Sequence, residues 1–210
     1  GFLLNYLDGR VGAMGKRTLI WDMRVFDEQD KELGSGQVGE LVGRPTDPSL
    51  RFYEYYKNPK ATEAKTRGGW LRTGDLAHYD EEGYFYFVDR KNDCMRRRGE
   101  NISSYEIEKV VNKHPQVLES AAYGVPSELA EDDVMICVVP QPGESINPED
   151  LVDYCAQNMS YYMVPRYIRF ADELEKTGTQ RVRKFKLKEE GVTPDTWDRE
   201  KSGYELKKQF

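Results

Sequence analysis

The sequence predicts an α+β protein in two parts, a small β-rich subdomain followed by an α+β C-terminal domain. Before residue 89, β-branched and aromatic residues reach strand density in several short runs. After it, strand-like and helix-like segments alternate over about a hundred residues. A polar run at residues 89–93 separates the two patterns. Because domain boundaries fall in such polar stretches, we expect domains at 1–91 and 92–210.

In the first part, short apolar runs alternate with turn residues, which predicts a β-rich fold of barrel or sandwich character. A Tyr-rich connector at 53–65 interrupts the strands and is expected to be helical after Pro59. The strongest strand signal is a hairpin with an Asp-Glu-Glu-Gly turn at 80–83. The expected strands are 18–26, 38–42, 71–79 and 84–88.

In the second part, residues 103–106 (Ser-Ser-Tyr-Glu) predict a capping box, in which Ser and Glu each satisfy an orphan amide at a helix start. The helix then has apolar residues on one face and ends before Pro115. Asn147 and Pro148 predict a second helix start, with Asn as the cap and Pro at the first helical position. The remaining expected elements are strands at 117–125, 134–139 and 167–170, and a basic helix at 182–191.

Composition narrows the classes of function. An apolar fraction of 38% supports folded cores, and a net charge of −6 argues against a nucleic-acid binder. The three cysteines, Cys94, Cys137 and Cys155, are an odd number without CxxC spacing, which favours reduced thiols over a disulfide scaffold or zinc site. No apolar run reaches membrane-spanning length and no signal-peptide pattern is present, so we expect a cytoplasmic protein.

Two charged residues stand at the ends of the expected hairpin strands. Asp75 lies in a Thr-Gly-Asp turn, and a carboxylate there can accept from both hydroxyls of a ribose. Arg90 closes a strand of aromatic residues and offers a fixed fork of donors for ribose or phosphate oxygens. From these residues alone, an ordinary turn cap and a solvated strand-end charge remain the alternatives.

Three segments in fixed order carry a more specific signal: Trp-Leu-Arg-Thr-Gly-Asp-Leu at 70–76, Gly-Tyr-Phe-Tyr-Phe-Val-Asp-Arg at 83–90, and Arg-Gly-Glu-Asn-Ile-Ser-Ser-Tyr-Glu-Ile-Glu at 98–108. Together they resemble the ATP-binding and hinge motifs of the adenylate-forming enzymes, which include acyl-CoA synthetases, luciferases and peptide-synthetase adenylation domains. The resemblance runs over nearly the whole chain, and the family's Ser/Thr/Gly-rich phosphate loop is absent from it. The tail at 190–198 looks most like the crotonobetaine/carnitine-CoA ligase branch.

The resemblance implies roles for five positions. Asp75 and Arg90 would bind the ATP ribose and phosphates. Asn92 falls at the hinge, where members commonly carry Asp or Lys, and the C-terminal domain would rotate there between two half-reactions. Arg98 and Gly99 would face coenzyme A, with the neighbouring arginines of the 96–98 run as further phosphate contacts or as a solvated basic turn.

A fourth segment departs from the family pattern. The loop at 176–184 corresponds to a family segment in which a Gly-Lys pair supplies a lysine that stabilises charge during adenylation. Here the pair is Gln180-Arg181, so the resemblance carries the catalytic position onto Arg181. Arg keeps the charge but is planar and bulkier than Lys. Lys184 and Lys186 are the nearest alternative lysines, a turn or more away on a helix.

The resemblance therefore implies part of an ATP-dependent acid–thiol ligase. Residues 1–91 would be the β-rich end of a large adenylation domain, and 92–210 a mobile, hinged C-terminal domain. Its substrates and cofactors would be a carboxylic acid, ATP with Mg²⁺, and coenzyme A, with a missing N-terminal domain as partner and the isolated fragment inactive. The alternatives are a non-catalytic swivel module and an adenylation-domain fragment that serves a carrier protein.

Overall fold

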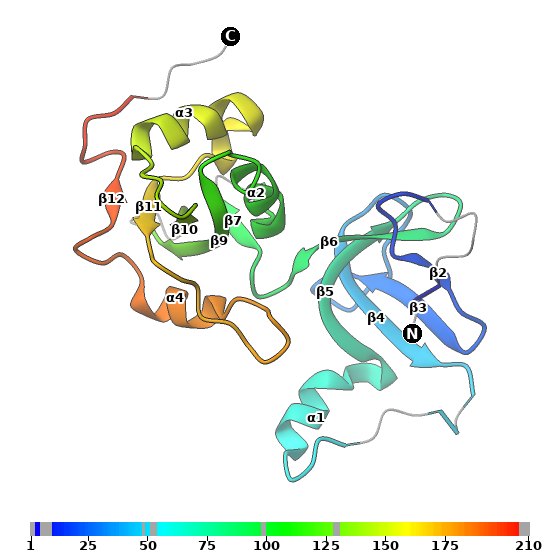
Figure 1. The fold of residues 1–210 in the computed structure, drawn as a ribbon. Coiled ribbons are helices and arrows are strands. Elements are labelled where there is room, and N and C mark those ends of the chain that lie inside the picture. The colour runs from blue at the N-terminus through cyan, green and yellow to red at the C-terminus, as the bar shows by residue number, and fades with distance from the viewer. Residues whose placement is uncertain are drawn as a thin grey trace. The chain divides into compact units, whose positions relative to one another are not determined.

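A computed structural model describes residues 3–4, 10–47, 49–50, 54–97, 100–127 and 131–205. The chain divides into two compact units, Gly1–Asn92 and Asp93–Phe210, each with its own sheet and core (Figure 1). We call them unit 1 and unit 2. Both helices and strands are present, so the predicted α+β class is confirmed.

Unit 1 is built on one antiparallel sheet, to which the described residues contribute six strands in the order β1-β2-β6-β5-β4-β3. One short helix, α1, follows the asparagine cap of Asn58, whose side chain accepts from the Ala61 amide. The elements are β1 (Leu3–Leu4), β2 (Gly15–Arg17), β3 (Trp21–Phe26), β4 (Gly39–Pro45), α1 (Pro59–Lys65), β5 (Leu71–Tyr79) and β6 (Tyr84–Arg90).

The β5–β6 hairpin forms where the sequence predicted it. The Asp80 side chain closes the turn, because its Oδ1 accepts from the amides of Glu82 and Tyr84 at 3.0 Å each. The register pairs Asp75 with Arg90 and shifts by a bulge between Leu76 and Ala77. Asp75, in the middle of β5, is therefore fixed opposite Arg90, the last residue of β6.

Other boundaries in unit 1 differ from the prediction. The expected strand at 18–26 is shortened to β3 at its start, because Leu19 and Ile20 form an exposed turn between β2 and β3 rather than extended backbone. The expected barrel or sandwich is a single curled sheet accompanied by a helix. Apolar density alone did not reveal that turn, since Leu and Ile are unusual turn residues.

Unit 2 combines two sheets and three α-helices among its described residues. A larger sheet has the order β12-β11-β10-β9, in which only the β10–β11 pair is parallel, and β7 and β8 form a separate hairpin. The elements are β7 (Met95–Arg97), β8 (Glu100–Ile102), α2 (Ser104–Val111), β9 (Val117–Pro126), β10 (Asp132–Pro140), α3 (Pro148–Asn158), β11 (Tyr167–Phe170), α4 (Lys184–Glu190) and β12 (Trp197–Asp198).

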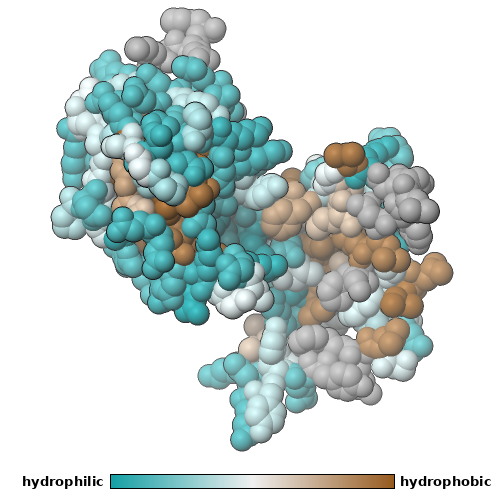
Figure 2. Space-filling view, in the orientation of Figure 1, coloured by the Kyte–Doolittle hydropathy of each residue, from teal (hydrophilic) through white to brown (hydrophobic). Residues whose placement is uncertain are grey.

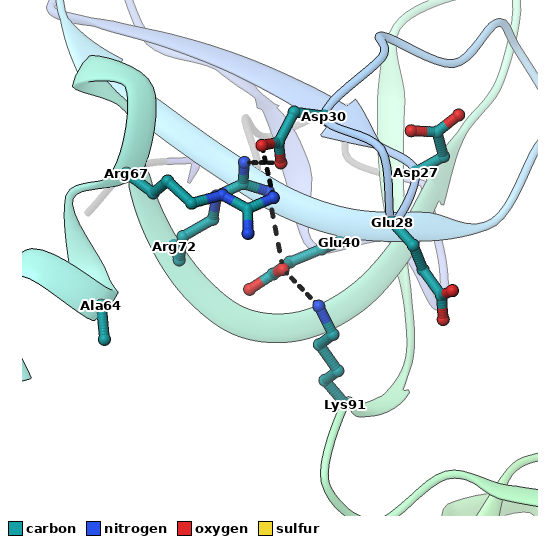
Figure 3. A pocket seen from close by; sticks show the side chains of 8 residues that line it. All are labelled: Asp27, Glu28, Asp30, Glu40, Ala64, Arg67, Arg72 and Lys91. Atoms are coloured by element: carbon teal, nitrogen blue, oxygen red, sulfur yellow. Dashed lines mark hydrogen bonds and ion pairs between the residues drawn. The ribbon is translucent and has the colours of Figure 1, made fainter.

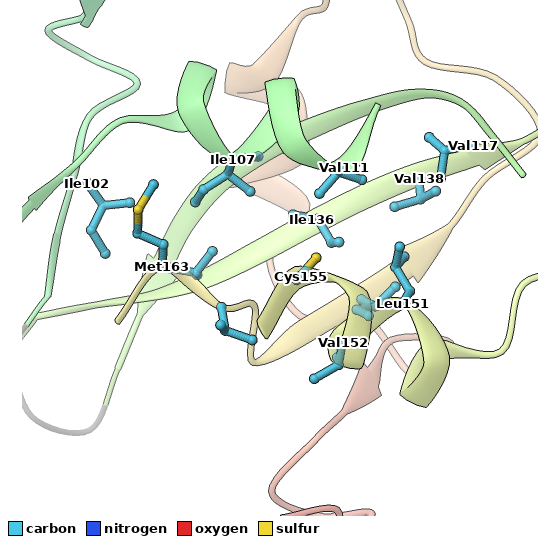
Figure 4. Packing of buried hydrophobic residues seen from close by; sticks show 14 of the residues in the cluster. Ile102, Ile107, Val111, Val117, Ile136, Val138, Leu151, Val152, Cys155 and Met163 are labelled. Atoms are coloured by element: carbon cyan, nitrogen blue, oxygen red, sulfur yellow. The ribbon is translucent and has the colours of Figure 1, made fainter. Parts of the chain in front are cut away.

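Strand β10 is buried on both faces and organises the core. Ile136 and Val138 point toward a cluster that includes Ile107 of α2 and Leu151 of α3 (Figure 4). The alternate residues, among them Cys137, join a second cluster with Leu187 of α4. Because successive strand residues face opposite sides, α2 and α3 cover one face and α4 covers the other.

The predicted helix caps appear at both sites. The Ser103 hydroxyl accepts from the Glu106 amide at 3.2 Å, and the Asn147 side chain accepts from the Glu149 amide at 2.9 Å. Helix α4 is shorter than the predicted 182–191, because residues just before Lys184 are engaged in a β-bridge between Lys176 and Val182.

Candidate functional site

Asp75 and Arg90 face each other across the β5–β6 hairpin. The Arg90 Nε lies 2.9 Å from the Asp75 Oδ1, and the two side chains are 40% and 23% exposed, respectively. The structure thus brings the two sequence-predicted residues together on two neighbouring interior strands of the sheet. Both side chains remain partly open to solvent.

Local hydrogen bonds define the backbone at Asp75. The Thr73 hydroxyl donates to the Leu41 carbonyl at 2.7 Å and accepts from the Asp75 amide at 3.1 Å. Gly74 has φ +78°, in the left-handed region that favours glycine, and its carbonyl accepts from the Lys91 amide at 2.9 Å. The Thr-Gly-Asp sequence therefore produces a kinked strand that presents Asp75.

A cavity of about 400 Å³ opens beside the pair. It has an apolar wall that includes Met14, Leu41 and Leu71, and a polar edge formed by Asp75 and Arg90. An apolar wall suits a flat aromatic base, whereas a carboxylate and a guanidinium suit hydroxyl and phosphate oxygens.

Lys65 also lines this cavity, and sequence reasoning did not single it out. Its Nζ donates to the carbonyls of Arg72 and Thr73 at 3.0 and 3.2 Å. It lies in the last turn of α1, six residues after Pro59. The helix prediction after Pro59 was the only sequence signal near it, since an isolated lysine in a Lys-rich connector carries no pattern.

A second, strongly charged pocket of about 330 Å³ lies in the same unit (Figure 3). Lys91 Nζ lies 2.9 Å from the Glu40 Oε2, and Arg72, paired with Asp30, approaches the same carboxylate at 3.6 Å. A hydrogen bond from Arg67 lowers the pKa of the Asp30 carboxyl. Buried Glu40 holds the Lys91 side chain, and the Gly74 carbonyl accepts from the Lys91 amide. Lys91 is therefore fixed at the end of unit 1.

Asn92 follows directly, as the last residue of unit 1, and is exposed. Two further candidates, Arg98 and Gly99, lie outside the described residues. For the arginines at 96–98 the sequence left two alternatives, phosphate contacts and a solvated basic turn, and Arg97 fits neither, because it is buried and pairs with Asp133 at 3.2 Å. Its role is to hold strands together, because a buried guanidinium needs a carboxylate partner.

Arg181 sits in unit 2, exposed in a tight turn between β11 and α4. The Thr177 amide donates to the Arg181 carbonyl at 2.8 Å, and the Gln180 amide donates to the Thr177 carbonyl at 2.9 Å. Gln180 has φ +62°. The left-handed region favours glycine, so Gln180 adopts this backbone at some conformational cost.

The two alternative lysines are both engaged. Lys184 Nζ donates to the Ser104 hydroxyl and pairs with Glu108, both at 2.7 Å. Lys186 pairs with Glu175 at 2.5 Å, and this hydrogen bond lowers the pKa of the Glu175 carboxyl. Arg181 is thus the cation that the turn itself leaves exposed.

Other chemistries find no support in the part of the chain that the structure covers. No group of three or more His, Cys, Asp or Glu side chains there is arranged to hold a metal ion. None of the three cysteines is in a disulfide, and burial raises the pKa of the Cys137 thiol to about 11 and that of Cys155 to about 12. Among the described helices, none is long and apolar enough to cross a membrane.

Comparison with known proteins finds a family match within unit 2 and longer relatives for most of the chain. Residues 106–181 match the AMP-binding enzyme C-terminal domain. The chain is 32% identical over 177 residues to the crotonobetaine/carnitine–CoA ligase of Citrobacter koseri, covering 84% of this chain and 34% of that protein. It is 35% identical over 176 residues to the same-named ligase of Proteus mirabilis, covering 83% and 34%. The chain thus spans about a third of the length of these curated relatives.

Solved structures of similar fold include ligases and ATP-bound relatives of the same kind. The anthranilate CoA ligase AuaEII in complex with anthranoyl-AMP superposes with a TM-score of 0.79 and 27% identity, covering 90% of this chain and 37% of that one. ATP-bound MatB from Rhodopseudomonas palustris superposes with a TM-score of 0.77 and 30% identity, covering 88% of this chain and 37% of that one. With its fold, its motifs and these relatives, the chain corresponds to the C-terminal portion of the adenylate-forming enzymes, and residues 106–181 belong to the AMP-binding enzyme C-terminal domain family.

Proposed function

We propose that this chain forms part of an ATP-dependent acid–thiol ligase. In the first half-reaction a carboxylate oxygen attacks the α-phosphorus of ATP, which forms an acyl-adenylate and releases pyrophosphate. In the second, the sulfur of coenzyme A attacks the acyl carbon, and AMP leaves as the thioester forms. The names of the curated relatives favour a small carboxylate such as crotonobetaine or carnitine as the acid.

The observation that carries the proposal is the Asp75–Arg90 pair at the rim of the 400 Å³ cavity. In this proposal Asp75 accepts from the ribose hydroxyls, and Arg90 donates to ribose or phosphate oxygens while holding the Asp75 carboxylate in place. The apolar wall receives the adenine. Two solved relatives carry an adenylate or ATP, which is consistent with this use of the fold.

Unit 2 supplies the groups that change between half-reactions. Arg181 would stabilise negative charge on the phosphates during adenylation, since its exposed turn leaves the guanidinium available. Arg98 and Gly99 would face coenzyme A, and Asn92 would serve as the hinge. Mg²⁺ would arrive with the ATP phosphates, which supply its oxygen ligands.

Unit 1 has features of a surface that packs against more protein. Its described residues expose several large apolar side chains, and Figure 2 shows such side chains, in brown, on its visible face. Val11 is 99% exposed and Leu19 is 95% exposed. Apolar surface of this kind is commonly covered in the complete assembly, and an N-terminal domain like that of the longer relatives would cover it.

The experiment is a chimera. Residues 1–205 replace the corresponding last third of the Citrobacter koseri ligase, and acid-dependent exchange of pyrophosphate into ATP is measured. We expect exchange from the chimera and a loss of at least 100-fold in its Asp75→Ala variant, with Glu63→Gln in exposed α1 as the control. A folded chimera that shows no exchange, or equal exchange with Asp75→Ala, contradicts the proposal.

A further inference from the structure

Side-chain contacts on both sides of the turn that carries Arg181 hold it to the rest of unit 2. Before the turn, Lys176 Nζ lies 2.7 Å from the Glu119 Oε2 on β9. After the turn, Lys184 begins α4 and its Nζ contacts both Ser104 and Glu108 of α2 at 2.7 Å. The turn is closed by the backbone bonds described above, so it is a short hairpin held by two side-chain anchors.

The second anchor is the more buried. The Lys184 side chain is 13% exposed and the Glu108 side chain 18%, and Ser104 is fully buried. The Glu108 Oε1 also accepts from the Ala122 amide of β9 at 2.8 Å. An ammonium withdrawn from water must keep its partners, because burial of an unpaired charge is costly. Lys184 therefore has one well-defined place.

The other lysines of α4 are held differently. Lys186 is 42% exposed and reaches Glu175, and Lys188 approaches Asp93 only at 4.0 Å. An exposed pair such as Lys186–Glu175 contributes little to fixing a backbone, since solvent competes for both charges. Lys184 ties α4 to α2 through two contacts.

We infer that Lys184 is a positioning residue for Arg181. It acts through the backbone. With Lys184 docked on Glu108 and Ser104, the first turn of α4 is fixed against α2. The backbone of Arg181, three residues before the helix begins, is thereby held in one orientation. This inference rests on the proposed function of Arg181. It assigns Lys184 a role distinct from the transition-state contact, and it assigns Glu108 and Ser104 as its receptors.

The expected consequence is a loss of rate with little loss of binding. Misplacing a catalytic group by about 1 Å can cost about 100-fold in rate. An interaction made mainly in the transition state lowers kcat more than it changes KM. Loosening the turn should therefore lower kcat of the adenylation half-reaction and leave the KM for ATP nearly unchanged.

The first test needs no catalysis. Amide hydrogen exchange of Thr177 and Gln180 is measured by NMR in this chain, in Lys184→Met, and in Lys188→Met as the matched lysine control. We expect at least tenfold faster exchange of these two amides in Lys184→Met, normal rates in Lys188→Met, and recovery in Lys184→Arg. Unchanged exchange in a folded Lys184→Met overturns the inference.

A second variant guards against a folding defect. Glu108→Gln keeps an oxygen to accept from the Ala122 amide but removes the charge that faces Lys184. We expect it to loosen the turn while the β10 amides keep their protection. If both variants also lose protection in β10, the pair is a general stabilising element of the core and the positioning role is wrong.

The chimera supplies the catalytic readout. Lys184→Met should lower kcat for pyrophosphate exchange by about 10- to 100-fold, leave the KM for ATP within about twofold, and leave thioester formation from pre-made acyl-adenylate intact. If exchange of the turn amides rises but kcat is unchanged, the role is refuted. If the unaltered chimera shows no adenylation while the amide result holds, the proposed function fails and the anchoring of the turn stands.

Discussion

Asp75 and Arg90 occupy one rung of the β5–β6 hairpin, and the Arg90 Nε lies 2.9 Å from the Asp75 Oδ1. A cross-strand pair of this kind is held by the sheet rather than by a ligand. The hairpin therefore orients the carboxylate beside the cavity. In the proposed function, this preorganisation lowers the ordering cost of binding a ribose.

The first prediction concerns AMP binding by the chain itself. We expect weak binding, with NMR shift changes centred on Asp75 and Arg90 and on the apolar wall at Leu41 and Leu71. Asp75→Asn keeps the size of the side chain but exchanges an acceptor oxygen for an amide group, so it should weaken binding at least tenfold. Glu63→Gln should bind normally, and equal affinities for both variants would refute the assignment.

The second prediction concerns the junction of the two units. Trypsin should cut first after Lys91, because the chain there leaves unit 1. The Lys91 side chain is held by Glu40 at 2.9 Å, and the protease must extract it to cleave. Glu40→Gln should therefore speed the appearance of the two fragments several-fold. Cleavage that begins elsewhere, or at one rate in both proteins, would show that the junction is not the accessible point.

The third prediction concerns the thiols. The thiolate is the form that reacts with iodoacetamide, and burial raises the pKa of Cys137 to about 11 and that of Cys155 to about 12. At pH 8 the half-buried Cys94 should be alkylated well before either. At this pH, labelling of Cys137 and Cys155 should require local opening of the structure, because very little of either buried thiol is ionised. Labelling of Cys155 at the rate of Cys94, followed by mass spectrometry, would contradict the buried placement.

Sequence reasoning located most elements of the fold, for identifiable reasons. The hairpin at 71–90 was readable because its turn contains Asp80 and Gly83 between aromatic strands, and α2 and α3 were readable from their Ser and Asn caps. It missed the turn at Leu19 and Ile20, where residues typical of strands are exposed. Short strands such as β7 and β12 contain too few residues for a period to be detected.

The candidate site was predictable only where a local motif carries it. Asp75, Arg90 and Arg181 stand in motifs, and the first two prove to be cross-strand partners. Lys65, Glu40 and the Lys184 anchor depend on contacts between residues far apart in the chain, such as Lys184 with Ser104. Such contacts result from tertiary packing, so no local sequence pattern predicts them. The same limit applies to Arg97, whose burial depends on its pairing with Asp133 on a distant strand.

The last prediction concerns Arg181 and separates the two half-reactions. Arg181→Ala in the chimera should lower acyl-adenylate formation by about 100- to 1000-fold, as expected for loss of one preorganised cation at a developing charge. The reaction of pre-made acyl-adenylate with coenzyme A should keep nearly its full rate, because in that step the sulfur attacks the acyl carbon and no bond forms to the α-phosphorus that Arg181 is proposed to serve. Arg181→Lys should retain or improve the first step, since lysine delivers the same charge from a smaller head group. A pyrophosphate-exchange assay and a thioester assay on the same preparations decide the matter. Equal losses in both steps, or no loss in either, would mean that the catalytic cation lies elsewhere than in this turn.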